Sequence, residues 1–229
     1  MNVQGYQKLT LLDYPGHVAC TVFTGGCNLR CPFCHNAGLV NTPAAYSSAE
    51  DEILQYLERR RGLLDGVCIT GGEPLLQPDL LSFIERIKQM GYLVKLDTNG
   101  SEPQRLRDVL ESGMIDYVAM DIKSSPEHYS LAVGATVDVT RFEESIRLIQ
   151  ASGIAHEFRT TAVKGIHTKD DFAAIGRWLG RDEAYFIQGF VDSGNLLGDG
   201  CSAFCEAEMK ELLQAVLPLI PRAALRGIS

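Results

Sequence analysis

The stretch VACTVFTGGCNLRCPFCHN, residues 18–36, joins an apolar run to a loop that contains three of the seven cysteines of this 229-residue chain. The run Val18–Thr24 is rich in β-branched residues and predicts a strand. Cys27, Cys31 and Cys34 follow it at a C-x3-C-x2-C spacing. Thiolates at such short spacing in one loop are typical ligands of a soft metal centre, and iron–sulfur clusters are generally held by cysteine. The stretch therefore predicts a metal centre at the end of a strand.

The number of cysteines in this loop bears on the kind of centre. A structural zinc site needs four ligands, commonly two separated pairs, whereas this loop has three thiols. In a cubane cluster, three protein ligands leave one iron open to bind a substrate. The alternative is a zinc site with His35 as the fourth ligand, but His35 directly follows Cys34 and reaches poorly for a tetrahedral geometry. The spacing therefore favours a [4Fe–4S] cluster.

Outward from this stretch, apolar β-rich segments alternate with helical patterns along the whole chain. The alternation makes six β/α units, and repeated units of this kind predict parallel strands with right-handed crossovers. Either an open doubly wound sheet or an incomplete (β/α) barrel satisfies the pattern, and Ser47 and Ser48 are expected to cap the first helix. We expect strands at residues 18–24, 67–70, 92–97, 116–121, 156–163 and 184–190, and helices near 47–61, 78–90, 104–112, 141–152, 170–179 and 206–217.

Polar residues collect where these strands end. The segments 71–73, 97–100 and 121–123 directly follow apolar strand patterns, and Gln188 lies near the end of another. In both architectures the chemistry belongs at the carboxyl ends of the strands. We therefore expect these residues to lie around one site.

Composition limits the partners and the compartment. The formal net charge is −8 and the isoelectric point is near 5.1, which argues against nucleic-acid binding because that needs a basic surface. No apolar run approaches the roughly 20 residues of a membrane span, and residues 1–13 lack a signal-peptide pattern. We therefore expect a cytoplasmic protein with no nucleic-acid or membrane partner, in a compartment where thiols stay reduced.

The cysteine loop resembles the signature of the radical S-adenosylmethionine (SAM) superfamily, including an aromatic residue, Phe33, before the third cysteine. The resemblance implies an α/β fold, an incomplete (β/α)6 TIM-like barrel, in a single domain. Residues 1–17 would form an N-terminal hairpin or extension, 18–190 the core units, and 191–229 a C-terminal loop and helix. It also implies that the three cysteines hold a [4Fe–4S] cluster whose open iron binds SAM, and that SAM cleavage yields a 5′-deoxyadenosyl radical.

The resemblance extends to residues that would contact SAM. Gly71-Gly72-Glu73-Pro74 is similar to the second motif of the superfamily, in which glycines allow close backbone approach and Glu73 would accept hydrogen bonds from the methionine ammonium. Phe33 would lie near adenine, or simply pack in the core. Gln188 would bond the ribose or adenine, or else satisfy backbone groups, and His35 is included among the cofactor-binding residues.

Two aspartates at neighbouring strand ends raise a question of charge. Asp97 and Asp121 would repel each other and the SAM carboxylate unless a positive group intervenes. Lys123 could pair with that carboxylate, or a monovalent cation could be held by the two aspartates, as in related activases. Both aspartates could instead cap the following segments. Arg159 is expected to contact an anion or ribose, since an inward arginine is rarely buried unpaired.

Within the superfamily, the chain is most similar to small activating enzymes. Segments 5–16, 21–26, 96–100 and 118–123 carry this likeness, and segments 190–196 and 225–228 resemble the anaerobic ribonucleoside-triphosphate reductase activating proteins. The resemblance implies a glycyl radical enzyme, anaerobic ribonucleotide reductase, as partner, and a flavodoxin or ferredoxin-type reductant. The alternatives are a pyruvate formate-lyase-type partner, a small-molecule enzyme of the carboxy-deazaguanine synthase type, and a non-catalytic zinc or electron-transfer protein.

The other cysteines are expected to have no chemical role. Cys20 and Cys68 lie inside apolar strand patterns and behave as small core residues. Cys201 and Cys205 also have a C-x3-C spacing, but two thiolates cannot hold a cubane, and the glycines before them predict a surface loop.

Overall fold

The computed structural model describes residues 1–41, 49–192 and 194–227, so the cap expected at Ser47 and Ser48 lies outside the described residues. Within these ranges eight strands form one sheet, in which each strand pairs with its neighbours in chain order. β1 is antiparallel to β2, and all the other pairs are parallel. The strands are β1 (Val3–Thr10), β2 (Ala19–Thr24), β3 (Gly66–Gly71), β4 (Leu93–Thr98), β5 (Tyr117–Asp121), β6 (Ala155–Ala162), β7 (Tyr185–Gly189) and β8 (Ala224–Arg226).

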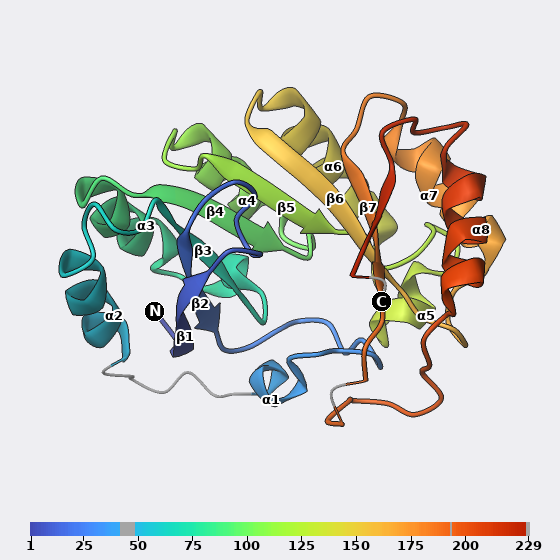
Figure 1. The fold of residues 1–229 in the computed structure, drawn as a ribbon, viewed down its shortest axis with the longest axis horizontal. Helices are drawn as coiled ribbons and strands as arrows, with labels where there is room; N and C mark the ends of the chain where they lie inside the picture. The colour runs from blue at the N-terminus through green and yellow to red at the C-terminus, as the bar shows by residue number, and fades with distance from the viewer. Residues whose placement is uncertain (42–48, 193, 228–229) are drawn as a thin grey trace.

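The strand order decides between the two architectures. A doubly wound sheet reverses its strand order at a switch point, whereas here the order runs from β1 to β8 without reversal. Within the described residues β1 and β8 remain the two edges, so the sheet is curved but not closed (Figure 1). The expected incomplete barrel is confirmed.

Helices cover the outer side of this curved sheet (Figure 1). Each long helix buries one apolar stripe: in α3 the buried residues Leu80, Phe83, Ile84 and Ile87 recur at helical spacing. No helix in the described part of the chain is long and apolar enough to cross a bilayer. The helical elements are α1 (Ala37–Val40), α2 (Ala49–Glu58), the 3-10 helix η1 (Pro74–Leu76), α3 (Leu80–Gln89), α4 (Pro103–Glu111), α5 (Tyr129–Val133), α6 (Val139–Ala151), α7 (Lys169–Leu179) and α8 (Glu206–Val216).

The last strand corrects the expectation for the C-terminal segment. Residues 191–229 were expected to form a loop and a helix, but Ala224–Arg226 pairs with β7 and extends the sheet. Three residues are too few to show an alternating pattern, so this strand exists through its pairing. At the other edge, β1 pairs antiparallel with β2, consistent with the expected N-terminal hairpin.

Alternation along the strands places polar side chains on the inner face. Successive side chains of a strand point to opposite faces, so residues two apart on β6, such as Arg159 and Thr161, face the same side, and both line the interior cavity. Asp121 on β5 is the register partner of Arg159. The fold thus brings charges from separate β/α units together at the carboxyl ends of the strands.

Candidate active site

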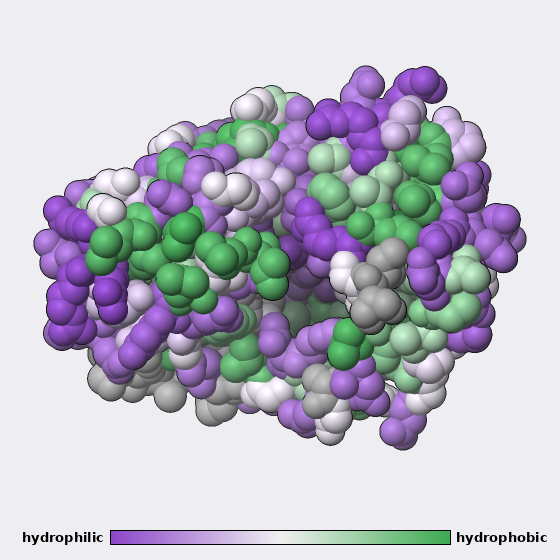
Figure 2. Space-filling model, in the orientation of Figure 1, coloured by the Kyte–Doolittle hydropathy of each residue, from purple (hydrophilic) through white to green (hydrophobic). Residues whose placement is uncertain are grey.

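A cavity of about 450 Å3 lies on the inner face of the sheet, and Figure 2 shows the molecule hollowed there. The cavity is lined by all the predicted site residues except Glu73. These residues are Cys27, Cys31, Phe33, Cys34, His35, Gly71, Gly72, Asp97, Asp121, Lys123, Arg159 and Gln188. The structure therefore joins strand ends that lie far apart in the sequence into one site.

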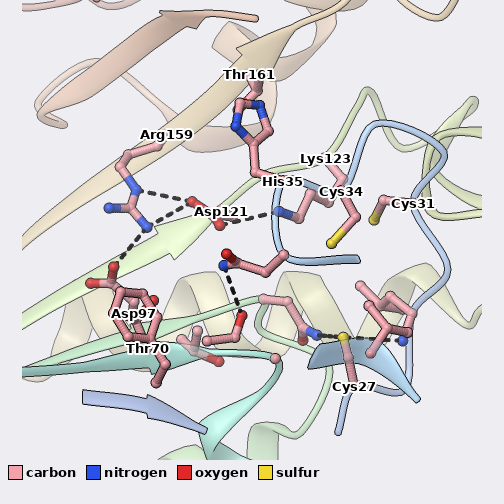
Figure 3. A pocket seen from close by; sticks show the side chains of 18 of the residues that line it. Cys27, Cys31, Cys34, His35, Thr70, Asp97, Asp121, Lys123, Arg159 and Thr161 are labelled. Atoms are coloured by element: carbon pink, nitrogen blue, oxygen red, sulfur yellow. Dashed lines mark hydrogen bonds and ion pairs between the residues drawn. The ribbon is translucent and has the colours of Figure 1, made fainter. Parts of the chain in front are cut away.

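The cysteine loop borders one end of this cavity (Figure 3). Backbone bonds fix the loop: Arg30 N donates to Val133 O at 2.8 Å, and Cys34 N donates to Cys31 O at 3.1 Å. All three thiols are free. Burial raises the pKa of Cys27, and it raises the pKa of Cys31 to about 11. The Cys27 and Cys31 thiols are therefore protonated at neutral pH, and metal binding must displace their protons.

The donor set of this loop fits an iron–sulfur cluster. Three soft thiol donors from one loop face one cavity. His35 also lines the cavity, and its ring packs edge-on against Phe190 with 5.7 Å between ring centroids. Phe33 is buried, with its ring 6.0 Å from that of His167, and it packs in the core while also lining the cavity. Its place near adenine stays a prediction.

A chain of alternating charges crosses the cavity wall (Figure 3). Arg159 donates from Nε to Asp121 Oδ1 at 2.9 Å and from Nη2 to Asp97 Oδ2 at 3.2 Å. Lys123 Nζ donates to Asp121 Oδ2 at 3.1 Å, and Lys95 pairs with Asp97. The order is therefore Lys95, Asp97, Arg159, Asp121, Lys123, with every carboxylate between two cations.

These pairings set the ionisation of both aspartates. Burial opposes ionisation, but Arg159 and the neighbouring lysines outweigh it and lower the pKa values of Asp97 and Asp121. The protein itself therefore resolves the expected repulsion, and charge neutrality does not require a monovalent cation. The Arg159 guanidinium binds Asp97 and Asp121 and lies 4.0 Å from a third carboxylate, that of Glu157. Its contact with a ligand anion or ribose stays a prediction.

Lys95 is the member of this chain that sequence reasoning missed. Its side chain is fully buried on β4, and it pairs with Asp97 two positions along the same strand face. A lysine inside the apolar run Leu93–Leu96 was the available signal, because a buried lysine needs a partner.

Glu73 occupies a different place from the one expected. Its side chain is fully buried outside the cavity lining. Its carboxylate accepts hydrogen bonds from Leu75 N at 3.0 Å, Thr98 Oγ1 at 2.8 Å and Asn99 N at 2.6 Å. Burial nevertheless raises the pKa of Glu73 to about 7. The carboxylate ties the end of β3 to the end of β4, rather than facing a ligand from the cavity wall.

Asn99, unlike Glu73, lines the cavity. Its Nδ2 lies 3.8 Å from Cys27 Sγ and donates to Asn28 Oδ1 at 3.2 Å. The sequence motif 96–100 contained this asparagine, but no role followed from the motif alone. The structure makes Asn99 the polar group that joins Glu73 to the cysteine loop.

The paired glycines allow two loops to approach each other. Gly71 has φ +118°, and a Cβ at Gly72 would lie 2.0 Å from Gly26 O. Glu73 N also donates to Gly26 O at 2.9 Å. The close approach expected toward a ligand is thus also a close approach between the ends of β2 and β3, next to Cys27.

The remaining cysteines lie outside this site. Cys20 and Cys68 are fully buried in the core, as expected. Cys201 is half-buried, Cys205 is exposed, and neither lines the cavity.

The open β/α sheet, with thiols and paired charges at its carboxyl ends, defines an enzyme of the partial-barrel class built around a soft metal centre. Residues 21–179 match the model of the Radical SAM superfamily, and the chain belongs to this superfamily. It is a radical SAM enzyme, and its cofactors are a [4Fe–4S] cluster and SAM. The zinc alternative is therefore not supported.

Within the superfamily, the chain is similar to two activating enzymes. A candidate glycyl-radical enzyme activating enzyme of Methanocaldococcus jannaschii is 32% identical over 193 residues, covering 82% of this chain and 79% of that protein. A pyruvate formate-lyase-activating enzyme of Clostridium pasteurianum is 32% identical over 126 residues, 53% of this chain and 52% of that one. The chain is thus homologous to glycyl-radical activating enzymes.

Two further similarities are more limited. A 7-carboxy-7-deazaguanine synthase of Hyperthermus butylicus is 38% identical over 96 residues, 42% of this chain and 40% of that protein. The crystal structure of Streptococcus suis SuiB bound to SAM superposes with a TM-score of 0.68 at 14% identity, covering 88% of this chain and 48% of that one. The chain spans about half the length of that structure, and the likeness concerns the fold.

Proposed function

We propose that this enzyme installs a glycyl radical in a partner protein, and that the partner is anaerobic ribonucleoside-triphosphate reductase. The observation that carries the proposal is the open side of the sheet: the cavity is lined both from the edge strand β1, by Gln7, and from β7, by Gln188. An opening of this kind suits a protein loop as substrate. The similarity to a candidate activating enzyme over most of both chains supports the same proposal.

The proposal gives each group of cavity residues a task. Cys27, Cys31 and Cys34 would hold the [4Fe–4S] cluster, and the cluster with SAM would supply the radical chemistry that removes a hydrogen atom from the glycine. Lys123 faces the cavity with Nζ donors beyond the one given to Asp121, so it can pair with the SAM carboxylate. Phe33 would border the adenine.

The other cavity residues position SAM or neutralise charge in the pocket. Gln188 would bond the ribose or adenine, and Arg159 holds Asp97 and Asp121 ionised and fixed in direction. In this proposal the two aspartates shape the pocket, with no monovalent cation between them. Glu73 acts through Asn99, which lies in the cavity lining.

The test uses the holoenzyme and a full-length partner. Anaerobically reconstituted enzyme, SAM and a reduced flavodoxin or ferredoxin are mixed with the reductase from the same genome. A doublet glycyl signal in the EPR spectrum is expected, and deuterium placed on the target glycine should appear in 5′-deoxyadenosine. Cys31→Ala is the matched inactive control. Deuterium that stays in the glycine would contradict the proposal.

A pyruvate formate-lyase-type partner is the second candidate, favoured by the similarity to the Clostridium pasteurianum enzyme. Assaying both partners in parallel separates the two, because only the true partner should reach a stoichiometric radical at low enzyme concentration. The short match to a 7-carboxy-7-deazaguanine synthase keeps a third outcome measurable: a pterin that donates the hydrogen would replace the activase proposal.

A further inference from the structure

One face of the molecule carries exposed apolar and basic side chains that do not line the cavity. We call it the leucine–arginine patch. Four of its leucines are 55–88% exposed, and Figure 2 shows hydrophobic side chains gathered beside the hollow of the cavity. The patch consists of Lys8, Leu9, Leu11 and Leu12 from β1 and the turn after it, and Arg59, Arg60 and Leu63 from the segment between α2 and β3.

The patch adjoins the active-site cavity. Gln7 on β1 lines the cavity and is the register partner of Thr21, which also lines it. Leu9 follows Gln7 by two residues, where the pairing of β1 with β2 is irregular. Asp13, after the exposed leucines, lines the cavity and accepts a hydrogen bond from Thr21 Oγ1 at 2.5 Å. Leu9, Leu11 and Leu12 therefore lie in the chain between two cavity-lining residues.

The two segments of the patch are joined by Tyr56. Its hydroxyl donates to Lys8 O at 2.8 Å, and Arg60 lies over its ring at 5.4 Å. Further along, Asp65 N donates to Val18 O at 2.8 Å. The end of α2 and the segment after it thus pack beside β1 and the start of β2.

The charges of the patch are unlike those of the chain as a whole. The protein carries a formal net charge of −8, yet Lys8, Arg59 and Arg60 are exposed and form no ion pair within the described residues. Exposed basic groups beside leucines attract an acidic surface and then bury its apolar side chains. An exposed apolar patch at an edge strand is otherwise an aggregation liability.

We infer that the leucine–arginine patch docks the glycyl radical enzyme, through a surface of that partner that presents apolar side chains flanked by carboxylates. Docking there places the partner next to the cavity mouth, where its glycine-bearing loop can enter. The inference rests on the proposed function and adds where the partner binds and by what chemistry.

The test compares two double variants with wild type, using the full-length partner that acquires the glycyl radical. Leu11→Asp/Leu12→Asp and Arg59→Glu/Arg60→Glu should each raise the KM for the partner at least about tenfold. SAM cleavage driven by dithionite without partner should match wild type, because the patch lies outside the cofactor site. High salt should slow activation by wild type more than by the arginine variant.

Matched controls lie elsewhere on the surface. Leu131→Asp changes an equally exposed leucine on α5, at 65% against 66% for Leu11, and Arg181→Glu changes an exposed arginine before β7. Both should activate with the wild-type KM. Patch variants with a wild-type KM would overturn the inference while leaving the proposed function intact. The inference would also be overturned if the patch variants lost binding to phosphatidylglycerol vesicles but kept the wild-type KM for the partner. If wild type activates no glycyl radical enzyme, both conclusions fail.

Discussion

Two segments of this chain share the C-x3-C spacing, 27–31 and 201–205, but they differ in everything that surrounds the thiols. The first lies at the end of β2, faces the cavity and has Cys34 as a third thiol. The second leads into α8, where Cys205 is the exposed N-cap residue. Spacing alone therefore does not make a cluster site: a strand end, a third ligand and a supporting polar shell do.

The largest difference is expected from removing the thiols themselves. Cys27→Ala, Cys31→Ala or Cys34→Ala should abolish SAM cleavage and lower the iron content from about four per chain, because each removes one of three cluster ligands. Iron analysis and 5′-deoxyadenosine release measure this. The matched double variant Cys201→Ser/Cys205→Ser should retain both, and iron loss in that variant would show a cluster role for the second segment.

Removing one ion pair near each segment should also change the free energy of unfolding by very different amounts. Arg159→Met should lower the free energy of unfolding by roughly 3–5 kcal/mol, because it removes the cation that two partly buried carboxylates share and leaves each with one lysine. Lys164 pairs with Glu208 near Cys205, at an exposed position, and Lys164→Met should have no measurable effect. Urea denaturation of the cluster-free proteins measures both changes.

Arg159→Lys is the conservative control, in case Arg159→Met does not fold. It keeps the charge but loses the two-pronged contact, so it should recover part of the stability. Equal losses in the Arg159 and Lys164 variants would contradict the difference between the two segments.

A smaller difference in stability is expected when a methyl group is added to a glycine near each segment. Gly72→Ala places a Cβ 2.0 Å from Gly26 O, a backbone atom next to Cys27, and should cost about 3 kcal/mol and reduce iron loading. Gly200 has φ +78° and open space around it, so Gly200→Ala should cost about 1 kcal/mol and leave iron loading unchanged. Thermal melts and iron analysis test this, and normal loading in Gly72→Ala would contradict it.

The smallest expected difference is in pH dependence. Burial raises the pKa of Glu73 to about 7 from 4.5, so the folded state binds more protons and the free energy of unfolding should fall as pH rises from about 4.5 to 7. A hydrogen bond from Lys164 lowers the pKa of Glu208, behind Cys205, to about 2. The contribution of ionised Glu208 to stability is therefore present above pH 4.5 and is lost only as the pH falls below that value.

Denaturation of the cluster-free protein at pH 5 and pH 8 measures this difference. Glu73→Gln should reduce the decline across that interval, whereas Glu208→Gln should leave it as in wild type. A decline unchanged in Glu73→Gln would assign it to another group.

Much of the fold could be read from local patterns. The six β/α units, the cysteine loop and the polar strand ends follow from periodicity and spacing, and each unit formed near its expected place. β8 could not be expected, since Ala224–Arg226 is too short to show a pattern and is a strand only because β7 lies beside it.

The site divides in the same way. The sequence by itself determined which residues reach the carboxyl ends of the strands, because alternation and strand length are local properties. Only the tertiary structure decided their partners: that the sheet stays in chain order, that Arg159 lies between Asp97 and Asp121, and that Glu73 turns away to bind Thr98 and Asn99. The strand order and these contacts depend on which strands are neighbours and in what register. The contacts join residues 25 to 62 positions apart in the chain, beyond the reach of any local pattern.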